Sequence, residues 1–415
     1  MYDVNQIRNT VILGHGNSGK TTLAEALLFT AGSVKRLGKV DDGTSSMDFE
    51  EEETKRQVSI SAGFNHLSWN KKEIFLIDTP GDDNFVNEAK FAAQVADSAL
   101  LTVGAVLGVR NQTEHFVDFV QNRKMPCLIC ITKMDRERAN FKKTVEEIKE
   151  SFDLNPVVLS LPIGAEADFK GVVDIARNQA LIFTEDGNVE SADIPADMAD
   201  EVASLRESLM EYVAETDDDL IERFLEEGEL TDDELEAGLA AGVSQGKIAP
   251  VFACASLQNS GSAVILDGIA ELLPSPDKCP AVMGTDPSSG DLIERAGLAD
   301  APFSAQVFKT MADPFAGRLT IFRVFSGTLS GDSFYNASKE TSERFGQLFV
   351  MEGKDQKPVD SAVPGMIVAV AKLKETTTGD INVAVGHSAL ANNTANNNQM
   401  ITSGISRIKP NPIQK

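Results

Sequence analysis

A glycine-rich stretch followed by a lysine and a threonine is the strongest chemical signal in the sequence. Residues 14–21 fit the pattern G-x-x-x-x-G-K-[ST] and stand between an apolar run and a segment of helical periodicity. In that setting main-chain N–H groups converge on phosphate oxygens, the lysine neutralises their charge, and the hydroxyl binds Mg²⁺. A chance glycine loop is the alternative, which the flanking strand and helix disfavour. The expected phosphate-binding residues are Gly14, His15, Gly16, Asn17, Ser18, Gly19, Lys20, Thr21 and Thr22.

A second motif, Asp78-Thr-Pro-Gly81, follows another apolar run. From the end of a buried strand, the Asp78 carboxylate would hold Mg²⁺ through water, so Asp78 joins Thr21 as an expected metal-site residue. The Gly81 N–H would reach a γ-phosphate and couple the following segment to hydrolysis. On its own D-x-x-G is a common turn, but its place after a phosphate-binding loop favours the chemical interpretation. We expect Lys20 and Gly81 to act in catalysis.

The third motif, Thr132-Lys-Met-Asp135, also follows an apolar run and points to guanine. The Asp135 carboxylate would accept the N1 and N2 hydrogens of the base, while Lys133 would lie over the ring. Adenine presents the wrong edge to such a carboxylate, and a site built on buried hydrogen bonds rejects the wrong partner strongly. GTP is therefore expected over ATP. The usual first residue of this motif is asparagine, so Thr132 is expected to loosen the bracing of the phosphate loop.

These motifs need a parallel sheet to position them. Short apolar runs at 10–13, 74–77, 99–103 and 127–131 alternate with helical patterns at 21–29, 88–96 and 113–121, which is typical of an α/β fold. A further strand is expected at 250–254 and a helix at 262–273. Cys127 and Cys130 fall inside one apolar strand and face opposite ways, so we interpret them as buried thiols rather than a zinc or redox pair.

An inserted subdomain, residues 158–249, is expected between the strands at 127–131 and 250–254. Its composition differs from that of the rest of the chain. Residues 185–236 contain 21 acidic side chains and only two basic ones, which accounts for most of the net charge of −25. A plain solvated face and a docking surface for a basic partner both fit this composition. The expected domains are a P-loop GTPase domain at 1–285, a linker at 286–300, an antiparallel β-barrel at 301–386 and a polar, disordered tail at 387–415.

The composition limits which partners the protein is expected to bind and in which compartment it is expected to work. The excess of 63 acidic over 38 basic residues opposes binding to DNA and to anionic membranes, so any contact with RNA is expected to be local. Four scattered cysteines suit a reducing compartment, and no run is long and apolar enough to cross a membrane. A cytoplasmic protein is therefore expected.

With these motifs in order, the chain resembles elongation factor G, a translational GTPase. The resemblance implies binding of GTP, GDP and Mg²⁺, a barrel after the GTPase domain, a monomer, and action at the GTPase-associated centre of the ribosome in translocation, with the acidic insert touching the stalk. It also implies a guanine-binding role for Cys254, Ala255 and Ser256. The supporting stretches are 47–49 with 59–60, 161–166, 171–174, 273–276, 313–318 and 376–380.

Four substitutions depart from the family pattern. Asn17 replaces the acid of the phosphate loop, where a monovalent cation is also expected, Ser59 replaces a Mg²⁺-binding threonine, Thr132 replaces an asparagine, and Asp82 replaces the catalytic histidine. Ser59 keeps its hydroxyl, so it remains an expected metal ligand. Asp82 is expected to be catalytic but adds negative charge beside the γ-phosphate, which predicts slow hydrolysis.

The family continues with three further domains, so this chain is expected to be truncated and to bind nucleotide without moving tRNA. A GTP-dependent ribosome-binding regulator that hydrolyses weakly or not at all is the alternative function. A GTPase of the tetracycline-protection or release-factor type is a third interpretation, which the insert and barrel motifs disfavour.

Overall fold

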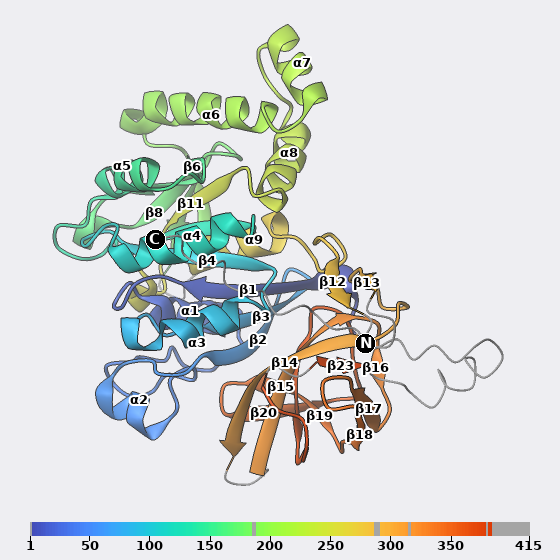
Figure 1. Ribbon diagram of the computed structural model, residues 1–415. Coiled ribbons are helices and arrows are strands. Elements are labelled where there is room, and N and C mark those ends of the chain that lie inside the picture. Colours follow the sequence, from blue (N-terminus) through green and yellow to red (C-terminus); the bar gives the residue numbers. More distant parts are fainter. Residues whose placement is uncertain (1, 185–187, 286–290, 314–316, 379–380, 384–415) are drawn as a thin grey trace, which may run out of the picture. The chain divides into compact units, whose positions relative to one another are not determined.

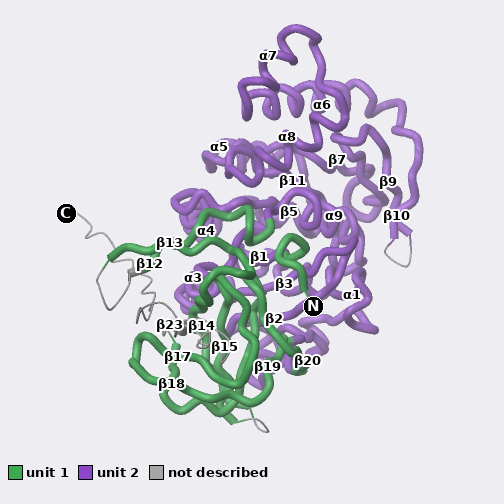
Figure 2. Tube along the Cα trace, turned by 90° about the vertical axis from the view of Figure 1, so that its right-hand side faces the viewer, with its two compact units in different colours: residues 1–7, 275–351, 355–415 green, residues 8–274, 352–354 purple. Residues whose placement is uncertain are grey.

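The computed structural model describes residues 2–184, 188–285, 291–313, 317–378 and 381–383. The chain divides into two compact units (Figure 2). The larger contains residues 8–274 together with 352–354, and the smaller contains the described residues up to 7, 275–351 and those from 355 on. Among the described residues, no helix combines the length and the apolar character that crossing a membrane requires.

A seven-stranded sheet, in the order β2-β3-β1-β4-β5-β11-β6, is the centre of the larger unit (Figure 1). Strand β4 is parallel to β1 and β5, β11 is parallel to β5 and β6, and β2 pairs antiparallel with β3. Every residue of β1, β4, β5 and β11 is buried, which explains their continuous apolar sequences. The strands are β1 Ile7–Leu13, β2 Gly63–Trp69, β3 Lys72–Asp78, β4 Ser98–Gly104, β5 Cys127–Thr132, β6 Pro156–Val158 and β11 Ala249–Ala253.

Helices cover this sheet, with α1 packed beside α9 and α4 packed on β4. The predicted α/β fold is confirmed, although β2 and α5 were not anticipated. Cys127 and Cys130 are buried free thiols, and burial raises the pKa of Cys127 to about 12. The helices are α1 Lys20–Thr30, α2 Glu51–Arg56, α3 Val86–Ala93, α4 Asn111–Asn122, α5 Phe141–Ser151 and α9 Ser262–Leu272.

An insertion separates β6 from its neighbour β11. It begins after Val158 with a four-stranded antiparallel sheet, in the order β10-β9-β8-β7, and continues with three helices that extend away from the main sheet (Figure 1). The acidic residues therefore lie largely on folded helices with solvated faces. The elements are β7 Ser160–Ile163, β8 Gly171–Asp174, β9 Gln179–Phe183, β10 Val189–Ala192, α6 Ala199–Ala214, α7 Asp218–Glu227 and α8 Asp232–Ser244.

The smaller unit contains an eight-stranded sheet in the order β18-β17-β23-β14-β15-β22-β19-β20, and neighbouring strands from β18 to β19 pair antiparallel. This agrees with the predicted antiparallel barrel. Two short strands, β16 Leu329–Ser330 and β21 Ser361–Ala362, pair separately. The sheet strands are β14 Ser304–Asp313, β15 Gly317–Ser326, β17 Ser333–Asn336, β18 Thr341–Arg344, β19 Leu348–Glu352, β20 Asp355–Val359, β22 Ile367–Ala371 and β23 Ile381–Val383.

The predicted boundary after the first domain needs correction. The main stretch of the larger unit ends at Pro274 rather than at residue 285, and residues 275–285 belong to the smaller unit. Strand β12, Val282–Thr285, pairs antiparallel with β13, Leu292–Arg295, so part of the predicted linker is a strand. The polar sequence of this segment concealed the pairing, because a two-stranded ribbon needs little apolar surface. Residues 286–290 and the predicted tail at 387–415 lie outside the described residues.

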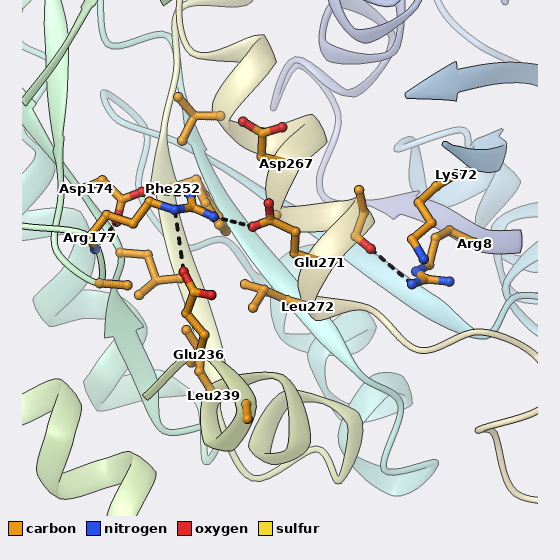
Figure 3. Close-up of a pocket in the computed structure, with 16 residues that line it drawn as sticks. Arg8, Lys72, Asp174, Arg177, Glu236, Leu239, Phe252, Asp267, Glu271 and Leu272 are labelled. Carbon is orange, nitrogen blue, oxygen red and sulfur yellow. Dashed lines mark hydrogen bonds and ion pairs between the residues drawn. The ribbon is translucent and has the colours of Figure 1, made fainter. Parts of the chain in front are cut away.

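One arginine joins the insert to the rest of the larger unit, beside a cavity of about 480 Å³ (Figure 3). Arg177, just after β8, pairs with Glu271 of α9 at 2.7 Å, Asp174 of β8 at 3.2 Å and Glu236 of α8 at 3.7 Å. Although burial disfavours its charge, the Glu271 and Asp174 carboxylates raise the pKa of Arg177 above its ordinary value. A single guanidinium thus balances three carboxylates that come from three elements.

Replacing Arg177 should therefore weaken the attachment of the insert. We expect Arg177→Met to lower the free energy of unfolding by about 1–2 kcal/mol, because three carboxylates lose their shared partner. Arg56→Met is the matched control, since Arg56 forms one exposed pair with Glu52 and should cost less than about 0.5 kcal/mol. Urea denaturation measures both values. Equal losses in the two variants would contradict a special role for Arg177.

Candidate functional site

The phosphate-binding loop, residues 14–19, connects the buried strand β1 to α1. Gly19 caps α1 with a φ of 96°, a left-handed conformation that side chains resist. A Cβ on Gly14, whose φ is 152°, would overlap Thr102 of the neighbouring strand β4. Both glycines are therefore required by the backbone path, and the first N–H groups of α1 are left facing the loop.

Three side chains from neighbouring strands fix the loop in place. The Ser18 hydroxyl lies 2.7 Å from the Thr102 hydroxyl, and the Thr132 hydroxyl donates to the Ser18 carbonyl. The Lys133 ammonium donates to the Asn17 carbonyl at 2.6 Å. The Thr132 hydroxyl thus reaches the loop directly, and whether threonine braces it less tightly than asparagine stays a prediction. The monovalent cation expected near Asn17 stays a prediction.

The lysine of the loop is deeply buried. Lys20 is 6 % exposed, and its ammonium donates to the Gly14 carbonyl at 3.1 Å and the His15 carbonyl at 3.0 Å. Burial lowers the pKa of Lys20 to about 8, against the opposing attraction of Asp78 and Asp48. A cation held inside a loop of main-chain amides is suited to bind phosphate oxygens.

The predicted metal ligands come together beside this lysine. The Thr21 hydroxyl lies 3.1 Å from the Ser59 hydroxyl, although the two are 38 residues apart. Asp78, at the end of β3, is 2 % exposed, and the nearby Thr21 hydroxyl favours its charged form. Burial, and then the charge of Asp48, raises the pKa of Asp78 to about 7.

A second buried carboxyl group, Asp48, completes the cluster and was assigned no role from the sequence. It is 5 % exposed, and burial raises its pKa to about 6 although the nearby Ser59 hydroxyl favours the charged form. Within the described chain, Asp48 Oδ2 and Asp78 Oδ1 are buried oxygens without a hydrogen-bond partner. The sequence signal that could have found it is the isolated acid between two apolar residues, Met47 and Phe49.

This set of oxygen atoms fits Mg²⁺. Two hydroxyls and two buried carboxylates are hard ligands of the kind that bind Mg²⁺ directly or through water. Thr21 and Ser59 would hold the ion, and Asp48 and Asp78 would accept hydrogen bonds from its water molecules. When bound, the ion neutralises charge on the β- and γ-phosphates.

The segment after β3 packs directly on the phosphate loop. A Cβ on Gly81 would overlap the Lys20 ammonium and lie 2.8 Å from the Gly16 nitrogen, so only glycine fits there. The next residue, Asp82, uses its carboxylate locally. Its Oδ1 accepts from the Asn84 main-chain N–H at 2.9 Å and from the Asn84 side chain at 2.7 Å, capping the turn Asp83–Phe85. Its catalytic role stays a prediction.

The residues expected to bind guanine meet at the ends of two paired strands. β5 and β11 are parallel neighbours, so Asp135 and Cys254–Ser256 follow adjacent strands. The Met134 N–H donates to the Cys254 carbonyl at 3.2 Å, which ties the two loops together. Burial raises the pKa of Cys254 to about 12, so this thiol is neutral. The Asp135 side chain is 11 % exposed, so it keeps one open side.

The fold and these loops define a P-loop nucleotide-binding protein. Residues 5–275 match the model of the elongation factor Tu GTP binding domain, and residues 302–384 match elongation factor G domain 2. The chain therefore belongs to the family of elongation factor G-like translational GTPases and contains the first two of their domains.

A solved structure agrees with this assignment. A crystal structure of a protein from Thermus thermophilus matches 92 % of this chain with a TM-score of 0.81 and 29 % sequence identity. This chain covers 54 % of that chain, so it spans about half the length of its solved relative.

The metal cluster gives a direct test of Asp48. We expect Asp48→Asn to raise the Mg²⁺ concentration needed for half-maximal GDP binding on the order of 10-fold, because an amide is a weaker acceptor for metal-bound water. Asp42→Asn, at an exposed position of the same loop, should leave it unchanged. Titration of Mg²⁺ against a fluorescent GDP measures this. An unchanged requirement in Asp48→Asn would show that the carboxyl lies outside the ion's reach.

Proposed function

We propose that this protein binds and hydrolyses GTP and acts on the ribosome at its GTPase-associated centre, supporting translocation. The single observation behind the proposal is the convergence of three motifs on one loop. Lys20 follows the loop and donates back to it, Gly81 packs against it, and the Thr132 hydroxyl bonds to it. A triphosphate, a divalent ion and a purine each find suitable groups there.

The guanine preference rests on Asp135 and the adjoining loop at 254–256. A carboxylate at this position would accept two N–H groups from guanine and none from that edge of adenine. The neutral Cys254 thiol and the Ser256 hydroxyl, 3.7 Å apart, line the same loop without adding charge. GTP and GDP are therefore the proposed ligands.

The proposed ribosomal contact involves the acidic insert. Helix α7 contains no buried residue, and it exposes Ile221 and the 77 % accessible Leu225 among acidic side chains. Such a face suits a basic, partly apolar protein surface, for which the ribosomal stalk is our candidate. The protein is proposed to act as a monomer in the cytoplasm, with only local contacts to ribosomal RNA.

A second function is a GTP-dependent ribosome-binding regulator that hydrolyses slowly. The observation favouring it is the Asp82 carboxylate, which caps a turn where the family has a histidine. A multiple-turnover GTP assay with and without ribosomes separates the two. Stimulation by ribosomes supports the GTPase, whereas ribosome binding that needs GTP but shows no turnover supports the regulator.

Base recognition predicts a large effect of one substitution. We expect Asp135→Asn to weaken GDP binding by about 100-fold or more, because the amide cannot accept both guanine N–H groups. Glu137→Gln, two residues further on and exposed, should bind GDP normally. Competition of GDP and ADP for each protein, followed by fluorescence, measures the preference. Equal GDP affinity in the two variants would remove Asp135 from the base-binding site.

A further inference from the structure

We propose that Gln112, on α4, positions the water molecule that attacks the γ-phosphate. This inference rests on the proposed GTP hydrolysis and assigns a residue to one of its steps. Asp82, the residue after Gly81, leaves open which group orients this water, because its carboxylate already accepts hydrogen bonds from Asn84.

The side chain of Gln112 reaches the phosphate loop from a different element. Its Oε1 accepts a hydrogen bond from the Gly16 main-chain N–H at 3.1 Å, across 96 residues of sequence. Helix α4 is fixed beneath it, because Thr113, Phe116 and Val117 are buried. The carboxamide is therefore placed by a packed helix rather than by a loose loop.

Gly16 lies where the reacting groups are expected to meet. A Cβ on Gly16 would lie 3.4 Å from the Gly81 carbonyl oxygen, and a Cβ on Gly81 would overlap the Lys20 ammonium. Gly81, Asp82 and Gln112 border the same narrow gap beside them. The carboxamide thus stands at the junction of the phosphate loop and the segment that would sense the γ-phosphate.

A carboxamide suits this task better than a carboxylate. It has one acceptor and two donor hydrogens, so Oε1 can accept from the attacking water while Nε2 donates to a phosphate oxygen. It is neutral, so it adds no repulsion as charge spreads over the γ-phosphoryl oxygens. Asp82 could only accept hydrogen bonds and would bring a negative charge.

The step itself is ordinary hydrolysis. The water oxygen forms a bond to the γ-phosphorus, and the bond from that phosphorus to the β–γ bridging oxygen breaks. The electron pair of the broken bond stays on GDP, and a proton of the water passes to a γ-phosphate oxygen. Gln112 orients the water and exchanges no proton.

Single-turnover GTP hydrolysis and GDP binding, measured on the same variants, test the proposal. We expect Gln112→Ala to slow hydrolysis on the order of 10- to 100-fold while GDP affinity changes less than about threefold. Gln112→Glu should be slow as well, because it restores the acceptor but adds charge. Gln121→Ala, which removes the other glutamine of α4, should hydrolyse GTP at the rate of the unmodified protein.

Two outcomes would overturn the assignment. If Gln112→Ala hydrolyses GTP normally, or loses GDP affinity in step with hydrolysis, Gln112 only braces the Gly16 N–H. If the unmodified protein shows no turnover with or without ribosomes, the proposed GTPase function fails and the role of Gln112 fails with it. The rate of the unmodified protein therefore distinguishes the two failures.

Discussion

The site depends on the burial of one ammonium group and two carboxyl groups beneath a single loop. Lys20, Asp48 and Asp78 are each at most 6 % exposed, and burial shifts the pKa of each toward its neutral form. Charges removed from water are costly unless they are paired or bound to a ligand. A triphosphate would pair with the ammonium group, and a divalent cation would pair with the carboxyl groups. The proposed ligand therefore offsets the cost of burying these charges.

The arrangement works because strand ends bring distant residues to one edge of the sheet. The loops after β1, β3, β5 and β11 supply the phosphate loop, the Gly81 segment and the two loops proposed to bind guanine. Hydrogen bonds join the last two loops to each other, and the Gly81 segment packs on the phosphate loop. Thr132 and Lys133 connect the guanine side to the phosphate side through Ser18 and Asn17. A movement of the loop that contains Lys133 would therefore also shift Asn17 and Ser18 of the phosphate loop.

Much of this site could be predicted from sequence because its motifs are local. The loop at 14–21, Asp78 with Gly81, and Asp135 each follow a recognisable apolar strand, and their spacing indicates one pocket. Asp48 and Gln112 could not be found in that way, since their roles depend on groups that only the folded chain brings near them. The hydrogen bond from the Thr132 hydroxyl to the phosphate loop could not be read from the motif either, because it depends on how the folded chain places Ser18.

The elements of the fold were likewise predictable where their sequence pattern is local and uniform. Buried parallel strands are uniformly apolar and were anticipated, whereas β2 and the ribbon of β12 and β13 mix polar and apolar residues and were not. The acidic insert was located by its charge, but Arg177 was not anticipated as its attachment, because its three carboxylate partners come from separate elements.

The place of the insertion has a consequence for biosynthesis. Since β11 inserts between β5 and β6 only after the whole insertion has been made, the emerging polypeptide has its phosphate loop long before the loop at 254–256 exists. The insert can mature on its own small sheet during that interval. Of the loops that meet at this edge of the sheet, the loop at 254–256 is thus the last to be made as the chain leaves the ribosome.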